Sequence, residues 1–350
     1  MMNRKKAIKG ICFVIIFIIL FMVMQKLLQA KWGSAGNNED IASTSTWTEF
    51  HSLEKNTVDV LFLGTSHVYC AVDPMYIYDK TGITSFVFGG PGLRMDLTYL
   101  NLEDCLKTQK PSVVFLDMSA IQFDFQQTEA KCHKVSDQFP ITLAKIEYAF
   151  NNGSEEMKPL DVLFPFFRYH SRWSDLEEQD FKYLINDVDV TITRGHRISY
   201  DNKKTEYHFY EEVEYVPYER NIDYIKRMQK LCDENDVELI LYKIPTPTWY
   251  ESQSKGAQEI GDSLGLTYLE PFYDVDKMGL DPHTDFRDKN NHMNQYGAEK
   301  FCDYLIDYMQ DNFELEDHRS TNLRWDKELK QYKKLVSEEK KSKDKKSSKK

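Results

Sequence analysis

The sequence is poor in cysteine, and its few cysteines do not form a recognisable motif. Six cysteines occur among 350 residues, and no two of them have the Cys-x-x-Cys spacing of a redox or zinc motif. One of them, Cys12, lies in an apolar N-terminal run, so an odd number remains in the rest of the chain. This pattern provides neither a disulfide framework nor a zinc site. We therefore expect most of the thiols to be buried as small hydrophobic groups.

The chain also lacks the positive charge that nucleic-acid-binding proteins carry. Its formal net charge is −11, although residues 1–9 contribute +4 and residues 338–350 contribute a further +4. The part between them is therefore close to −19. A surface this acidic repels phosphate backbones, which argues against nucleic acid as a ligand.

A membrane-targeting segment lies near the N-terminus. Four basic residues before position 10 precede the apolar run from Ile11 to Met24, which Leu27 and Leu28 extend. The strictly apolar part has the length of a signal-peptide core, but Lys26 can snorkel and no Ala-x-Ala cleavage site follows. These features favour an uncleaved, single-pass anchor. The basic flank keeps the N-terminus in the cytoplasm, so we expect everything after about residue 30 to be extracytoplasmic.

Composition divides the rest of the chain into a body and two flanking segments. Residues 31–47 are rich in small and polar types, which is typical of a tether. Residues 337–350 contain almost only Lys, Glu, Asp and Ser and cannot bury enough apolar surface to fold. Roughly 270 residues remain for one large domain. The predicted boundaries are 1–30 for the basic end and anchor, 31–50 for the tether, 51–315 for the domain, and 316–350 for a charged, largely disordered tail.

The predicted domain alternates strands and helices, which indicates an α/β fold with a mostly parallel sheet covered on both faces. The expected strands are residues 58–63, 84–88, 112–116, 237–243 and 267–269, and the expected helices are residues 74–80, 93–106, 218–235, 251–264 and 295–309. The alternation fails over about 123–215, where polar and aromatic residues show little period. Such a block is most simply a cap inserted over the active-site edge of the sheet.

Two segments far apart in the sequence carry the residues of an activated serine. The first is a buried strand ending in a Gly-Thr-Ser turn at Ser66, a place where open α/β sheets hold their ligands. The second is a loop before the last predicted helix, where His292 follows two acids, Asp288 and Asp285, either of which can orient its ring. A serine hydroxyl needs a histidine to remove its proton, and that histidine needs a carboxylate. We therefore predict that Ser66 attacks, that His292 is its base, and that Asp288, the nearer acid, orients the ring.

These two segments resemble the first and last blocks of the SGNH/GDSL hydrolase superfamily. That resemblance implies a three-layer, flavodoxin-like fold and a second block that supplies a glycine amide to an oxyanion hole. Residues 89–92 (Gly-Gly-Pro-Gly) match this block in position, and we assign the oxyanion amides to Ser66 and Gly90. The chain departs from the superfamily pattern twice. The last block is usually Asp-x-x-His but has one more residue here, and the third block normally supplies an Asn that residues 116–120 (Leu-Asp-Met-Ser-Ala) lack.

The missing Asn block, together with the anchor and an outward-facing domain, resembles the branch that contains the teichoic-acid D-alanylation protein and SGNH partners of membrane-bound O-acyltransferases. The resemblance covers about residues 57–120 and 237–310. It implies a serine-dependent acyl-ester hydrolase or O-acyltransferase that acts on a cell-envelope polysaccharide or its acylated precursor, with a membrane-bound O-acyltransferase as a candidate partner. No metal or organic cofactor is implied. The alternative is a catalytically silent envelope protein that binds glycan or scaffolds an acyltransferase complex.

Inside the insert, Arg168, His170, Arg172 and Trp173 form an unusual local cluster. Tryptophan stacks on sugar rings and arginine binds phosphate or carboxylate groups, so the cluster is a candidate substrate-binding surface. An insertion between the third and fourth strands emerges near the carboxyl edge of the sheet, which also holds the predicted nucleophile. We therefore expect these residues to border its cleft. The alternative is that the aromatic residues form a small core of the insert and the arginines a solvated rim.

Overall fold

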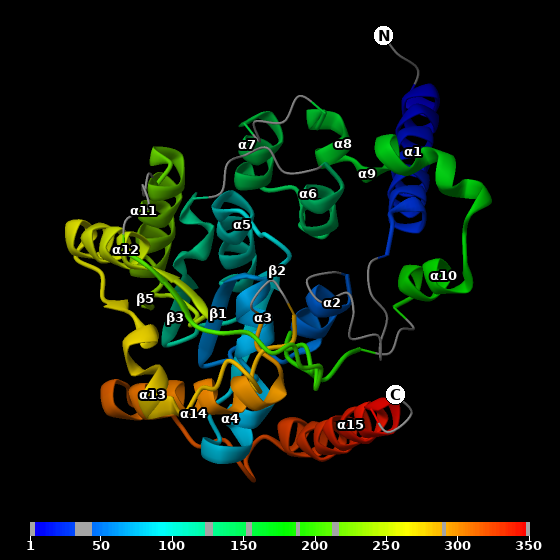
Figure 1. Ribbon diagram of the computed structural model, residues 1–350. Helices are drawn as coiled ribbons and strands as arrows, with labels where there is room; N and C mark the ends of the chain where they lie inside the picture. Colours follow the sequence, from blue (N-terminus) through cyan, green and yellow to red (C-terminus); the bar gives the residue numbers. More distant parts are fainter. Residues whose placement is uncertain are drawn as a thin grey trace.

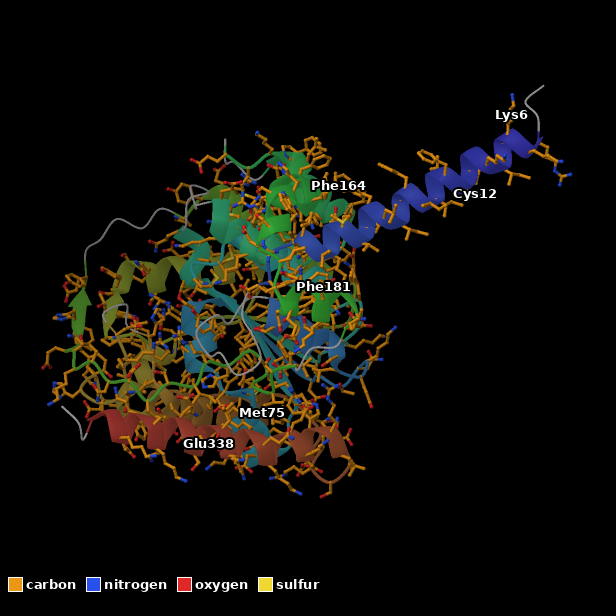
Figure 2. All side chains as sticks on the ribbon, turned by 90° about the vertical axis from the view of Figure 1, so that its right-hand side faces the viewer. Lys6, Cys12, Met75, Phe164, Phe181 and Glu338 are labelled. Carbon is orange, nitrogen blue, oxygen red and sulfur yellow. The ribbon has the colours of Figure 1, made fainter. Side chains whose placement is uncertain are left out.

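The computed structural model describes residues 4–31, 44–122, 129–151, 156–186, 190–211, 217–288 and 292–347 (Figure 1). Most of the predicted tether, both predicted ends of the insert and the last three residues of the predicted tail lie outside these ranges. Helices surround a central sheet, and one helix at the N-terminus projects from the body (Figures 1 and 2).

The centre of the domain is a parallel sheet. Its strands are β1 (Val60–Thr65), β2 (Ser85–Gly90), β3 (Val113–Asp117), β5 (Glu238–Tyr242) and β7 (Tyr268–Leu269), in the spatial order β2-β1-β3-β5-β7. Val60 lies opposite Ser85 on one side and Val113 on the other. Counted along the chain, this is the 2-1-3-4-5 strand order of flavodoxin-like folds. The predicted α/β class with a mostly parallel sheet is confirmed.

Helices cover both faces of the sheet, which makes the domain three-layered. One face carries α3 (Ser66–Ala71), α4 (Pro74–Thr81) and α14 (Gln295–Asn312), and the other carries α5 (Met95–Cys105), α11 (Glu219–Asp233) and α12 (Glu251–Leu264). Alternate residues of β1 explain this division. Val60 and Phe62 join the first core, while Leu61 and Leu63 join the second. A strand that is buried on both faces must be apolar throughout, as β1 is.

The residues just before the first strand belong to the fold, although residues 31–50 were predicted to form a tether. Helix α2 (Thr44–Ser52) packs on the domain, and its Phe50 ring contacts Phe86 of β2. The fully buried Glu49 carboxylate binds the Arg194 guanidinium at 2.6 Å. Composition misses this helix because two aromatic side chains, Phe50 and Trp47, and a few polar contacts, rather than a broad apolar face, attach it.

Helix α1 (Arg4–Leu28) is, within the described ranges, the one helix long and apolar enough to cross a membrane. Figure 2 shows it projecting from the body near Phe164 and Phe181. Its apolar window is not buried by the rest of the protein, whereas its last turns pack against α9 (Pro165–Tyr169) and α10 (Glu178–Leu184). Exposing this much apolar surface to water would cost free energy, whereas lipid would cover it. The structure is therefore consistent with the predicted anchor.

The predicted insert is a helical subregion with a small core of its own. It contains α6 (Glu129–Ser136), α7 (Leu143–Asn151), α8 (Pro159–Leu163), α9, the 3-10 helix η2 (His170–Ser174) and α10. Side chains of α6, α7 and α8 pack with Leu97 and Leu100 of α5. The chain then returns to the sheet, where the Val87 amide donates to the Arg194 carbonyl oxygen at 2.9 Å. The helices of the insert therefore lie beside α5 and α1.

Shorter elements complete the domain. They are the two-stranded sheet of β4 (His208–Tyr210) and β6 (Thr248–Tyr250), the 3-10 helices η1 (Met118–Gln122) and η3 (Pro271–Asp274), and α13 (Val275–Met278). Phe209 of β4 and Trp249 of β6 contact Phe272 of η3, so an aromatic cluster attaches this part to the body.

The residues predicted to be a disordered tail form a long helix instead. Helix α15 (Leu323–Ser347) packs on α4, with Trp325 1% and Tyr332 3% exposed. The Tyr332 hydroxyl donates to the Asp73 carboxylate at 2.6 Å, and the Arg194 guanidinium lies 4.2 Å from the centre of the Trp325 ring. The prediction was wrong because the purely charged composition begins only after residue 336. The preceding residues carry an apolar stripe at helical spacing.

We expect Trp325→Ala to lower the free energy of unfolding by about 3–5 kcal/mol, the usual cost of removing a fully buried large aromatic side chain. Denaturant titration of the detergent-solubilised full chain, followed by circular dichroism, measures this loss. Leu323→Ala is the matched control, because Leu323 lies in the same helix but is 76% exposed and should change stability little. Equal stability of the two variants would contradict the packing of α15 on the domain.

Candidate active site

Ser66 lies at the carboxyl end of β1, in the turn that begins α3. Thr65 caps this helix: its hydroxyl oxygen accepts from the His67 amide at 3.4 Å, and the hydroxyl donates to the Asp117 carboxylate at 3.0 Å. Gly64 makes room for that carboxylate, because a Cβ at this position would lie 2.5 Å from the Asp117 Cβ. The Gly-Thr-Ser sequence thus brings the end of β3 against the turn that carries Ser66.

A short hairpin carries the predicted acid and base. Phe286 and Met293 form an antiparallel bridge, and the Arg287 amide donates to the His292 carbonyl oxygen at 2.9 Å. Asp288 and His292 adjoin the paired residues Arg287 and Met293. We call the paired segments 286–288 and 292–293 the His292 hairpin.

The structure brings Ser66, His292 and Asp288 together. His292 Nε2 lies 2.8 Å from Ser66 Oγ, and His292 Nδ1 lies 2.8 Å and 3.0 Å from the two carboxylate oxygens of Asp288. The serine hydroxyl then donates to Nε2 while Nδ1–H donates to the carboxylate, which is the arrangement of a serine triad. The longer spacing between acid and histidine is compatible with this contact, because the pairing of Phe286 with Met293 places Asp288 beside His292.

Asp285, the alternative acid, occupies a different place. It is 1% exposed, and its carboxylate accepts from the Asp281 amide at 2.8 Å and pairs with Lys300 Nζ at 2.7 Å. Lys300 belongs to α14, so this ion pair ties the loop before the hairpin to that helix. The contact with the histidine ring is made by Asp288.

The His-x-Asn-x-x-Gly pattern after Asp288 holds the hairpin on α14. The Asn294 side chain caps the helix by accepting from the Tyr296 and Gly297 amides, and its amide group donates to the Thr284 carbonyl oxygen at 2.7 Å. Gly297 allows close approach, because a Cβ there would lie 2.6 Å from the Asp285 carbonyl oxygen. The pattern therefore positions His292 through the backbone.

Burial and a neighbouring imidazole set the charge state of the site. Burial lowers the pKa of His292, and His67, whose ring centroid lies 4.8 Å away, lowers it further. The hydrogen bond to Asp288 opposes these effects but does not reverse them. Burial alone would raise the pKa of Asp288, but the hydrogen bond from His292 and the pairing with Arg287 hold it below its ordinary value. A neutral imidazole beside an ionised carboxylate is the state that a general base requires.

The glycines predicted to form the oxyanion hole lie on the strand beside the nucleophile. Gly90 ends β2 and pairs in register with Thr65, and a Cβ at Gly89 would lie 2.8 Å from the Thr65 carbonyl oxygen. The end of β3 holds Asp117 in place of the expected Asn. Its fully buried carboxylate accepts from the Thr65 and Ser119 hydroxyl groups. A carboxylate does not donate hydrogen bonds, so Asp117 does not replace the missing oxyanion donor.

Three neighbours of the triad were not predicted from the sequence. His67 contacts the ring of the base, Arg287 donates from Nε to Asp288 at 3.2 Å, and Asp117 binds the turn at the end of β1. His67 and Arg287 each adjoin a predicted residue, and Asp117 occupies the place of the expected Asn. These sequence positions were the available signal for the three residues. Adjacency in the sequence, however, does not show which way a side chain points.

Of the four insert residues expected at the cleft, Arg172 lies at the junction with α1. Arg172 donates to the carbonyl oxygens of Leu28 at 2.7 Å and Gln29 at 3.0 Å, at the end of that helix. The other three remain within the insert: Arg168 pairs with Glu129, His170 Nδ1 lies 2.8 Å from the Phe167 carbonyl oxygen, and Trp173 is 70% exposed. The expectation is not met, because the insert packs against α5 and α1 after it leaves the sheet edge.

The geometry is suited to attack of a serine oxygen on an acyl carbon, since the nucleophile, base and orienting acid are in hydrogen-bonded order. Across the described part of the chain, no three His, Cys, Asp or Glu side chains are placed to hold a metal ion. The five cysteines of the body are buried and unpaired, and burial raises the pKa of the Cys70 thiol, close to Ser66 in sequence, to about 12.

Comparisons with known proteins identify distant likenesses to several solved structures, including the three that follow. A proposed acylhydrolase from Bacteroides fragilis is 9% identical over 75% of this chain and 93% of its own, with a TM-score of 0.37. A GDSL-like lipase from Bacteroides thetaiotaomicron is 8% identical over 76% and 96%, with a TM-score of 0.37. A lipase/acylhydrolase from Enterococcus faecalis is 12% identical over 74% and 98%, with a TM-score of 0.34. No family model and no curated protein matches the chain, and no activity transfers from likenesses this distant.

We expect His292 to titrate below its ordinary pKa of 6.5 and His67→Gln to raise that pKa, because the substitution removes a neighbouring group that disfavours the imidazolium. Nuclear magnetic resonance titration of the histidine C2 protons measures both values. His170→Gln is the matched control, since His170 is an exposed histidine of the insert. A midpoint that stays constant or falls in His67→Gln would contradict the electrostatic role of His67.

Proposed function

We propose that this chain is a serine-dependent acyl-ester hydrolase or O-acyltransferase of the SGNH type. The observation that carries the proposal is the hydrogen-bonded series from Ser66 through His292 to Asp288, at the carboxyl edge of a parallel sheet. The serine and the histidine are 226 positions apart in the sequence and meet only in the folded chain. In the tautomer with its proton on Nδ1, His292 donates to Asp288 and accepts from the Ser66 hydroxyl, which are the directions that activation of a nucleophile requires.

The proposed reaction proceeds through an acyl-serine. Ser66 Oγ attacks the acyl carbon while its proton passes to His292 Nε2, and Asp288 stabilises the imidazolium. The amides of Ser66 and Gly90 stabilise the tetrahedral oxyanion. The leaving alcohol then takes the proton from His292 and departs. Water or a sugar hydroxyl attacks the acyl-serine with His292 again as base, so the same residues serve hydrolysis and transfer.

The end of β3 favours a slow reaction with simple esters. Asp117 offers a buried acceptor there, where an Asn side chain would donate to the oxyanion. One missing oxyanion donor typically costs roughly a hundredfold to a thousandfold in rate. A natural substrate that brings its own binding energy from groups remote from the ester compensates for part of this loss.

We propose an extracytoplasmic location and a cell-envelope glycan, or its acylated precursor, as the substrate. The apolar helix α1 and the basic residues before it support a single membrane span with the domain outside the cytoplasm. The absence of the Asn block supports assignment of this chain to the branch of SGNH proteins that work with membrane-bound O-acyltransferases. Such an acyltransferase is the proposed partner, and it would supply or receive the acyl group at the membrane.

A catalytically silent glycan-binding or scaffold protein is the second candidate function. The observation that favours it is again Asp117, because a buried carboxylate beside the predicted oxyanion groups does not assist a developing negative charge. In that case the three hydrogen-bonded residues would support the fold of the sheet edge and would not turn over an ester.

A fluorophosphonate probe separates the two candidates, because it reacts covalently with an activated serine. We expect the full chain in detergent to be labelled and to hydrolyse p-nitrophenyl acetate slowly. Ser66→Ala should abolish both, since it removes the nucleophile, whereas Ser171→Ala, a change at an exposed serine of the insert, should alter neither. Labelling that persists in Ser66→Ala would exclude Ser66 as the nucleophile. A folded wild-type chain that takes no label would favour the silent alternative.

We also expect Asp288→Asn to lower kcat/KM for the activated ester by on the order of a thousandfold to ten-thousandfold, because an amide favours the wrong tautomer of the histidine. Initial rates at pH 7.5, about a unit above the ordinary histidine pKa, measure the effect. Asp311→Asn is the control, as Asp311 is an exposed acid on α14. A loss smaller than about tenfold would show that Asp288 does not orient His292.

A further inference from the structure

Aromatic packing attaches α1 to the insert near the end of the helix. The ring centroid of Phe21 lies 5.9 Å, 5.4 Å and 6.4 Å from those of Phe164, Phe166 and Phe167, respectively. Helices α9 and α10 and the 3-10 helix η2 all contact α1. The insert therefore lies alongside the last third of the helix that carries the apolar run.

Polar contacts hold the end of α1 as well. The Arg172 guanidinium donates to the Leu28 and Gln29 carbonyl oxygens, which have no partner within the helix, and pairs with Asp180 at 2.9 Å. Lys26 Nζ donates to the Asn186 side-chain oxygen at 2.9 Å. Arg172 thus caps the C-terminus of α1, which is a favourable place for a cation.

The length of α1 sets the depth of the insert in a bilayer. A hydrocarbon core is about 30 Å thick and is spanned by about 20 helical residues. Lys9 is the last basic residue before the apolar run, and Phe21 follows it by twelve residues, about 18 Å along the axis. Even if Arg4 marks the cytoplasmic boundary, Phe21 lies only about 26 Å from it. The phenylalanines that contact Phe21 therefore lie within the hydrocarbon core wherever α1 spans a membrane.

Four large apolar side chains near this attachment are exposed, among polar and acidic neighbours such as Asp175 and Glu178. Phe167, Trp173, Phe181 and Ile185, here called the collar, are 45%, 70%, 50% and 71% exposed. They belong to α9, η2, α10 and the residue that follows α10, and Phe181 lies near the point where α1 leaves the body (Figure 2). Exposed apolar side chains gathered around a spanning helix, with a tryptophan among them, are typical of the aromatic belt at a membrane boundary.

We propose that the collar is a membrane-seating surface, inserted among the headgroups and upper acyl chains of the leaflet on the domain side. This function is independent of the proposed acyl chemistry. It gives the Arg168–Trp173 segment a role in anchoring: Arg172 joins the helix to the insert, and Trp173 lies at the lipid boundary. A lipid surface is favoured over a protein partner as the occupant, because lipid is present at this depth wherever α1 crosses the bilayer.

The test compares tryptophan emission of the full chain and of its Trp173→Phe variant in phosphatidylcholine nanodiscs, because Trp47, Trp249 and Trp325 also emit and the difference reports Trp173. Trp32 closely follows α1 in the sequence, so it is replaced by Phe in every protein compared. We expect lipids brominated on their acyl chains to quench the emission of the parent protein and Trp173→Phe to lose most of this quenching. Quenching should be stronger with bromine near the headgroup than with bromine at the bilayer centre, and aqueous acrylamide should quench Trp173 little.

Charged substitutions in the collar provide the second arm. Phe167→Glu combined with Phe181→Glu should reduce quenching of Trp173 by bromolipid and raise its quenching by acrylamide, while Leu323→Glu, at an exposed leucine of α15, should change neither. If Trp173 is open to acrylamide in nanodiscs that retain the chain, the collar is not seated in lipid. Protection of Trp173 in native membranes but not in pure lipid would assign the collar to a protein partner and overturn the proposal. Release of the full chain from membranes by alkaline carbonate would show that α1 does not span the bilayer and would overturn the membrane-seating proposal. Loss of esterase activity alone would contradict the proposed acyl chemistry but not the membrane-seating proposal.

Discussion

The hydrogen bond between His292 and Ser66 depends on two helices that pack on the same face of the sheet. Helix α3 begins at Ser66 and α14 begins three residues after His292, and their side chains share one apolar core, which includes Val68 and Phe301. Both helices start at the carboxyl edge of the sheet, so their first turns lie side by side and the residues before α14 reach those that begin α3. The 2.8 Å separation of His292 Nε2 and Ser66 Oγ requires a closely packed core. A shift of about 1 Å between the two helices would break the productive alignment.

A buried polar network adds a second constraint at the start of α14. Gln295 donates to the Asp73 carboxylate at 2.8 Å, Tyr332 donates to the same carboxylate at 2.6 Å, and the His196 ring lies 3.0 Å from the Gln295 side-chain oxygen. The Gln295 amide also donates to the Ser199 carbonyl oxygen at 2.7 Å. These groups come from the N-cap of α4, the part of the insert that returns to the sheet, α14 and α15. Because an unsatisfied buried polar group is costly, each partner fixes the others, and the C-terminal helix thereby helps to hold the loop that carries His292.

The parts of the fold that sequence could predict are those set by local pattern. The continuous apolar run of β1, the turn at Ser66 and the acid and histidine before an amphipathic helix each have a local physical cause, and the mostly parallel sheet follows from alternating strands and helices. Helix α15 was missed because the charged composition after residue 336 was extended to the whole tail, although Trp325 and Tyr332 begin an apolar stripe that packs on α4. Asp117 was noted only as an absent Asn, since its contact with the turn before Ser66 exists only once β1 and β3 are paired.

The Arg168–Trp173 segment shows why composition alone does not assign a function. Tryptophan with arginine is suited to sugar binding, but the same pair of residue types is suited to a membrane boundary, where the ring meets lipid and the cation meets helix carbonyls or headgroups. What distinguishes the two is the neighbouring element, and here that element is the end of α1. A domain on a flexible tether samples many heights above a bilayer, whereas one held by both a helix cap and a seated collar does not. If the collar is seated as proposed, the fold sets the height of Ser66 above the membrane, and an acyl donor or acceptor must be presented at that height, which favours a membrane-linked glycan or a membrane-bound partner over a freely diffusing ester.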